Sequence, residues 1–126
     1  MAPAREVAVL VGDLAWGDIL DGPMRSTALD LLSRVEPAQR WGVTAGVPDE
    51  PPPGTLIGIK DGWVQTDYGW WWVNSAGVVV PSDAHPAYSI AVLSKHQPSM
   101  EYGVETIQTI ASRVHAALHG EALRSE

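Results

Sequence analysis

The sequence has no cysteine and no phenylalanine among its 126 residues, and it has no long apolar run. Without cysteine, the chain has no disulfide, no thiolate ligand for zinc and no cysteine nucleophile. No stretch approaches the roughly 20 apolar residues that cross a bilayer as a helix. Acidic residues follow the short apolar run near the N-terminus too early for a secretory signal, so we expect mature sequence there. The sequence does not indicate a cellular compartment.

Basic residues are also few. Eight Lys and Arg stand against 15 Asp and Glu, which gives a formal net charge of −7. A surface that binds phosphates needs clustered cations, so this balance argues against nucleic acid as a partner. The length fits one domain or lobe covering residues 1–126, with a real hydrophobic core.

Apolar periodicity predicts two helices. The short apolar run 7–11 is either a strand or the tail of a helix. Gly-Asp occurs twice after it and is typical of turns, so we expect residues 1–21 as a whole to be irregular. An amphipathic helix is predicted to open at Gly22-Pro23 and to stop at Glu36-Pro37. A second helix is predicted after Ser99, which can cap it, and Gly120 is the expected stop. Its apolar stripe comprises Ile107, Ile110, Ala111, Val114 and Leu118.

Strands are predicted between these helices. The runs 55–64, 70–80 and 88–94 are rich in β-branched and aromatic residues, and residues 41–47 suit a further short strand. Asp67-Tyr68-Gly69 is typical of a hairpin turn, and the segment 74–77 suggests a bulge. Because the connections are short, we expect an antiparallel sheet of three to four strands, packed by N- and C-terminal helices. The predicted fold class is therefore α+β.

One lysine lies among the apolar residues of the run 55–64. Burying an unpaired ammonium is costly, so Lys60 either reaches the edge of the sheet or faces a site. Gly58 and Gly62 flank it and leave room for another backbone or a ligand. This stretch is the strongest candidate site in the chain.

The order Lys60-Asp61-Gly62 followed by Trp63 resembles the third motif of the penicillin-recognising serine hydrolases, which reads Lys-Thr-Gly or Lys-Ser-Gly. The segments QRWGV, VNSAGVVV and IAVLSKH surround it, and a closing helix follows. This succession is similar to the C-terminal half of actinobacterial-type members of the family. The resemblance implies a β-lactamase-like C-terminal lobe over residues 22–126, no cofactor, and a small-molecule or peptide substrate. Members of this family are often exported.

The same resemblance implies roles for four residues. Lys60 would be the catalytic cation beside a nucleophilic serine, and Asp61, Gly62 and Trp63 would bind the substrate. Asp61 departs from the pattern, because a carboxylate in the place of a hydroxyl would neutralise Lys60 and repel an anionic β-lactam.

The nucleophile motif Ser-x-x-Lys does not occur in the sequence, because Ile57 and Val92 lie three residues before the two lysines. Ser-x-Asn and Tyr-x-Asn are also absent. Acyl transfer on amide or ester bonds would therefore require a serine from a missing N-terminal lobe or from a separate subunit. We also expect that the chain can form a homodimer.

Two other hypotheses stay open at this point. Four tryptophans lie between Trp63 and Trp72, and paired strands could present them as a platform for sugars or peptides, unless they line the core instead. His115 and His119 are spaced to share one helix face, which can hold a metal. The sequence offers them no third ligand, so we predict no metal site.

Overall fold

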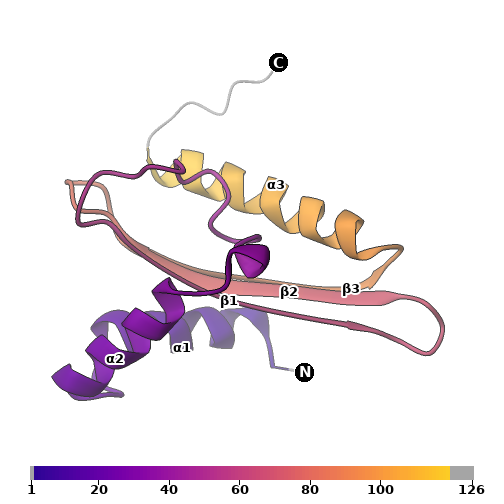
Figure 1. Ribbon diagram of the computed structural model, residues 1–126, viewed down its shortest axis with the longest axis horizontal. Coiled ribbons are helices and arrows are strands. Elements are labelled where there is room, and N and C mark those ends of the chain that lie inside the picture. The colour runs from indigo at the N-terminus through magenta and orange to yellow at the C-terminus, as the bar shows by residue number, and fades with distance from the viewer. Residues whose placement is uncertain (1, 120–126) are drawn as a thin grey trace.

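The computed structural model describes residues 2–119. Three helices and a three-stranded sheet form the molecule. The helices are α1 (Ala4–Trp16), α2 (Gly22–Ser33) and α3 (Met100–Leu118), and a short 3-10 turn covers Pro37–Gln39. The strands are β1 (Leu56–Gln65), β2 (Trp71–Val80) and β3 (Tyr88–Gln97), in the spatial order β1-β2-β3. Figure 1 shows α3 on one face of the sheet and α1 and α2 on the other. The α+β class with an antiparallel sheet is confirmed.

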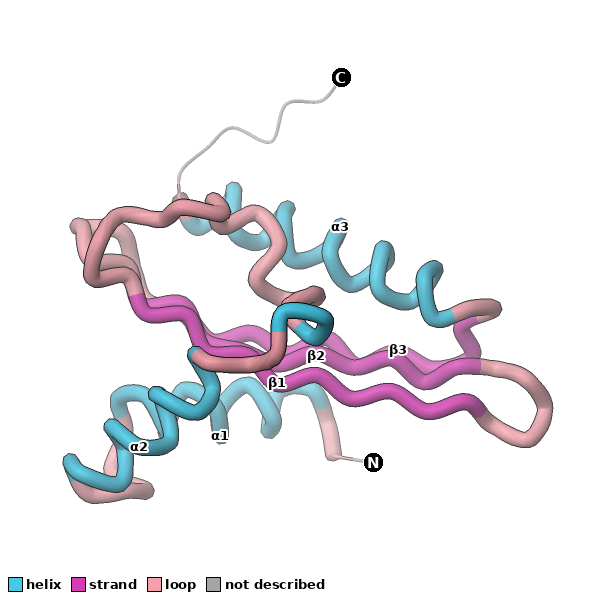
Figure 2. Tube along the Cα trace, viewed as in Figure 1, coloured by secondary structure: helices cyan, strands magenta, loops and turns pink. Residues whose placement is uncertain are grey.

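Both strand pairs are antiparallel. Lys60 pairs with Ala76 and Asp61 pairs with Ser75, and the β1–β2 register runs without interruption from Leu56↔Val80 to Gln65↔Trp71. The predicted hairpin turn is present, since the N–H of Gly69 donates to the carbonyl of Thr66 at 3.0 Å. Gly69 has φ +84°, which glycine adopts without strain. The elongated hairpin and its loop are visible in Figure 2.

The hydrophobic core lies between α3 and the sheet. Its buried side chains come from the loop before β1, from all three strands and from α3: Val43, Ile59, Val73, Val79, Tyr88, Ile90, Ile107 and Ala111. The Ser99 hydroxyl caps α3 by accepting the N–H of Tyr102 at 3.0 Å, as predicted. A Cβ on Gly103 would lie 2.5 Å from Cγ2 of Val73, so a bare backbone lets α3 approach β2 closely.

Helix α2 follows the expected local rules. The carboxylate of Asp21 accepts the N–H of Met24 at 2.9 Å, and Pro23 lies in the first turn. The helix ends at Ser33, shortly before the predicted stop. In contrast to α3, α2 has no fully buried residue, so it packs only lightly on β1.

Three local predictions are wrong. Residues 4–16 form α1 and are not irregular, although no side chain caps the helix start. Residues 41–47 form turns in place of a strand, because Gly42 and Gly46 both have positive φ. The segment 74–77 is regular strand, and the register irregularity of β2 lies between Trp71 and Val73.

Part of the predicted stripe of α3 is also corrected. Ile107 and Ala111 are buried, and Val114 packs against the core, but Ile110 and Leu118 are exposed. The expected stop at Gly120 lies outside the described residues. None of the helices in the described part is long and apolar enough to cross a membrane.

Candidate functional site

Lys60 lies on the face of the sheet that carries α1 and α2, away from α3. Strand residues alternate between the two faces, and its neighbours Ile59 and Asp61 point into the α3 side. The side chain of Lys60 is exposed, and its Nζ donates to the backbone oxygen of Asp61 at 2.6 Å. Because β1 is an outer strand of the sheet, the ammonium reaches an open edge. Its desolvation cost is therefore avoided.

The carboxyl of Asp61 lies on the opposite face and is buried, with 4% of the residue exposed. Burial raises its pKa to about 6, while the Ser75 hydroxyl, the charge of Lys60 and the backbone amide of Trp41 act in the other direction. Ser75 and the amide lie close, yet neither carboxylate oxygen makes a hydrogen bond of good geometry within residues 2–119. Asp61 therefore contacts Lys60 through its backbone oxygen, and its carboxyl lies on the α3 side of the sheet.

The loop before β1 is held by side chains around Asp61. The N–H of Val43 donates to Oγ of Ser75 at 3.0 Å, and the N–H of Gly42 donates to Oε1 of Gln108 at 3.3 Å. A Cβ on Gly42 would lie only 2.2 Å from Oγ of Ser75. The loop therefore packs closely against Asp61 and Ser75, which explains why the carboxyl of Asp61 is buried.

Gly62 and Trp63 lie further along the open edge of β1. A Cβ on Gly62 would meet no atom within 4 Å, so the space beside this backbone is free. The indole of Trp63 is 42% exposed, and its ring centroid lies 5.7 Å from that of Trp41 at a tilt of 57°. Lys60 and Gly62 thus share one face, while Trp63 borders the same edge from the other face.

A cavity of about 380 Å³ opens beside Lys60, between the sheet and the helices α1 and α2. Side chains that line it include Val7, Val11, Leu14, Leu32, Ala76 and Leu93. Its lining is almost entirely apolar. Lys60 is the only cation among the lining residues. The sequence alone does not predict this cavity, because it gives no clear indication of α1.

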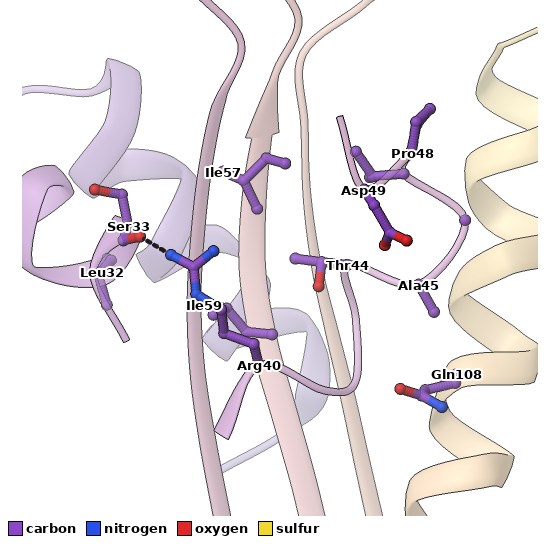
Figure 3. Close-up of a pocket in the computed structure, with 12 residues that line it drawn as sticks. Leu32, Ser33, Arg40, Thr44, Ala45, Pro48, Asp49, Ile57, Ile59 and Gln108 are labelled. Carbon is purple, nitrogen blue, oxygen red and sulfur yellow. Dashed lines mark hydrogen bonds between the residues drawn. The ribbon is translucent and has the colours of Figure 1, made fainter. Parts of the chain in front are cut away.

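A second cavity of about 320 Å³ lies on the α3 side, between the end of α2, the loop and β1 (Figure 3). The guanidinium of Arg40 donates to the backbone oxygens of Ser33 and of Val35, the latter at 3.1 Å. Asp49 lines the same cavity. Arg40 is held by the backbone, so its visible role is to fix the end of α2 to the loop.

Four aromatic rings and one carboxylate form a chain near the end of α3. The hydroxyl of Tyr88 and Nδ1 of His115 are 2.8 Å apart, and burial raises the pKa of Tyr88 to about 12. The rings of His115 and His119 are 3.9 Å apart, and His119 stacks on His85 at 4.2 Å and 16°. The backbone N–H of His85 donates to Oδ1 of Asp83 at 3.0 Å, and Nδ1 of His85 lies 2.8 Å from the same oxygen. These two hydrogen bonds lower the pKa of Asp83.

Stacked rings direct their nitrogens along parallel planes, so His85 and His119 do not converge on a shared ion. Within residues 2–119, no group of three or more His, Asp or Glu side chains is arranged to hold a metal.

The tryptophan cluster is divided among different contacts. Trp63 contacts Trp41, and the exposed Trp70 contacts His96 edge-on at 6.1 Å. Trp71 packs against the core. Among the described residues, the tilted contacts of Trp63 and Trp70 provide no parallel indole pair for stacking on a sugar.

The Lys60 strand, its antiparallel partners and the covering helix match a known family. The family model described as the β-lactamase enzyme family matches residues 1–118. The chain belongs to the β-lactamase enzyme family. No curated protein matches the sequence.

Solved structures show the same β-lactamase fold. A structure of PBP-A has a TM-score of 0.69 at 23% identity and covers 92% of this chain and 39% of its own. A variant of the last common ancestor of Gram-negative class A β-lactamases has a TM-score of 0.71 at 23% identity, covering 94% and 42%. The β-lactamase from Burkholderia vietnamiensis gives 0.65 at 21% identity, covering 93% and 40%. The chain thus spans about two fifths of the length of these structures.

Proposed function

We propose that this chain is the C-terminal lobe of a β-lactamase-like serine hydrolase, which transfers acyl groups from amide or ester bonds and carries half of an active site. One observation supports this most: Lys60 presents its ammonium at the open edge of β1, next to the free space beside Gly62. Family membership adds the expectation that a serine nucleophile acts beside this strand.

In the proposed mechanism, a serine hydroxyl attacks the carbonyl carbon of the substrate, and negative charge develops on the carbonyl oxygen. Lys60 assists electrostatically, and the free edge of β1 at Gly62 hydrogen-bonds the extended substrate. Trp63 packs along the same edge. The serine comes from polypeptide outside this sequence, either an N-terminal lobe or a separate subunit, because the chain has no Ser-x-x-Lys.

Asp61 acts indirectly in this proposal. Its carboxyl is buried on the α3 side, beneath the loop that carries Trp41, and so lies away from the edge that would receive the substrate. Its backbone oxygen also fixes the ammonium of Lys60. We therefore replace the predicted side-chain contact between Asp61 and substrate with a positioning role.

The test uses a fluorescent penicillin and an activated ester, with intact mass as the readout. The chain by itself should gain no covalent adduct. When joined or mixed with an upstream polypeptide that carries Ser-x-x-Lys, it should support acylation of that serine. Lys60→Met should slow acylation by roughly 100-fold, the scale of losing one electrostatic group, whereas the matched control Lys95→Met should not. An adduct on the isolated chain, or equal rates for both variants, would contradict the proposal.

A further inference from the structure

The cavity beside Lys60 has the composition of a site for an amphiphile. Its volume is about 380 Å³, and it lies between α1, α2 and the sheet. Pockets that bind small molecules have volumes of roughly 300–1,000 Å³ and combine apolar walls with a few polar groups. This cavity fits that description, because one cation borders an apolar interior.

Its walls come from elements that are far apart in the sequence. Val7, Val11 and Leu14 face it from α1, Leu32 from α2, and Ala76 and Leu93 from the two inner strands. These six side chains carry no hydrogen-bonding group. The one amide side chain in the lining, Asn74, uses its Oδ1 to accept the N–H of Ser94 at 3.0 Å, so the interior favours an alkyl chain over a sugar or a peptide backbone.

The charge at the cavity is asymmetric. Lys60 lies on this face and is exposed, whereas the carboxyl of Asp61 is buried on the α3 side. The ammonium makes one hydrogen bond, to the backbone oxygen of Asp61, and an ammonium has three donors. An oxyanion or a carbonyl oxygen at the mouth would therefore find a complementary donor.

We propose that this cavity binds the alkyl chain of a medium-chain acyl compound, with the acyl carbonyl or carboxylate at Lys60. At about 30 Å³ for each methylene-sized group, the share of liquid volume that one water occupies, the cavity has room for roughly twelve heavy atoms, the size of decanoate with its ten carbons and two oxygens. This inference deepens the proposed function, because it names the acyl group that the Lys60 site would receive.

Calorimetric titration of the chain with decanoate tests the proposal without any serine. Decanoate should bind, and butanoate should bind at least tenfold more weakly, because it has the same charge but little apolar surface. Lys60→Met should weaken decanoate binding at least tenfold and leave decan-1-ol unchanged. The matched variant Lys95→Met should change decanoate binding less than twofold. Equal effects of the two lysine variants, or equal binding of butanoate and decanoate, would overturn the proposal.

A second measurement locates the ligand. Amide chemical shifts should move at Val11, Leu14 and Gly58 when decanoate is added, and Leu93→Trp should abolish these changes by filling the cavity. If Leu93→Trp fails to fold, the shift map of the unmodified chain still decides the question, since shifts confined to other residues would refute the site. Loss of decanoate binding at rising protein concentration would show that a second copy fills the cavity, and would also refute it.

The two proposals fail in different ways. Decanoate binding needs no nucleophile, so its absence would leave acyl transfer at Lys60 standing with a different acyl group. Conversely, intact decanoate binding without acylation in the completed protein would reject the hydrolase and retain the acyl site.

Discussion

The two faces of the sheet differ in how completely they are packed. On the α3 face, Val73 and Ile107 have no exposed surface, and the loop before β1 closes the remaining space. On the other face, α1 and α2 leave a cavity beside Lys60, and several of their large apolar side chains are about half exposed or more: Val9, Leu10, Trp16, Met24 and Leu31. One face therefore provides stability, and the other provides accessible surface beside the candidate site.

The largest expected effect lies on the packed face. Ile107→Ala should lower the free energy of unfolding by about 2–5 kcal/mol, because it opens a cavity in a closed core. Ile110→Ala is the matched control, since Ile110 lies on the same helix with 42% exposure, and it should cost well under half as much. Urea unfolding of both variants measures the difference. Similar losses would show that the core is not centred on α3.

Asp61 should make stability depend on pH. Its pKa is about 6 in the folded chain against 3.8 for the unperturbed group, so the folded state favours the protonated carboxyl. This contribution to the free energy of unfolding is fully present below about pH 4 and is lost as the pH rises through 6. The expected loss is about 1–3 kcal/mol, since one pKa unit corresponds to about 1.4 kcal/mol.

Asp61→Asn tests this dependence, because the amide keeps the shape of the side chain and cannot ionise. Urea unfolding at pH 4.5, 6 and 7.5 should show that the free energy of unfolding of the unmodified chain falls as the pH rises. In the variant this fall should be much smaller. A decline of equal size in both proteins would show that Asp61 is not the source of the pH dependence.

The smallest effect on stability is expected on the open face. Leu31 is 62% exposed on α2, so Leu31→Ser should change the free energy of unfolding by no more than about 0.5 kcal/mol. The same change should reduce self-association in sedimentation velocity, because it interrupts an apolar surface. An unchanged sedimentation coefficient across concentrations, in both proteins, would contradict the expected homodimer.

Elements with strong local signals were predictable from the sequence. The Asp67-Tyr68-Gly69 turn set the β1–β2 hairpin, and Ser99 marked the start of α3. Both signals depend on residues a few positions apart, so no tertiary information was needed. Once the strand was recognised, alternation also placed Lys60 on the face opposite to its apolar neighbour Ile59.

The remaining features depend on distant contacts. Val43 is buried because Ser75 and Gln108 bind the loop around it, and neither partner is near in sequence. The carboxyl of Asp61 is buried by the same loop, which the motif alone could not reveal. Helix α1 has no side-chain cap, and its apolar residues follow one another too closely to show a clear period, so the cavity that it helps to form was also missed.

The contact of Gly103 with Val73 fixes how α3 can slide along the sheet. The buried positions of α3 are Gly103, Ile107, Ala111 and His115, each four residues after the last. A shift of the helix by about one turn would keep all of these positions facing inward, so periodicity alone permits it. Such a shift would bring a larger side chain over Val73, where even a single Cβ lies too close. The absence of a Cβ at Gly103 thus selects a single alignment of α3 among several that are equally amphipathic.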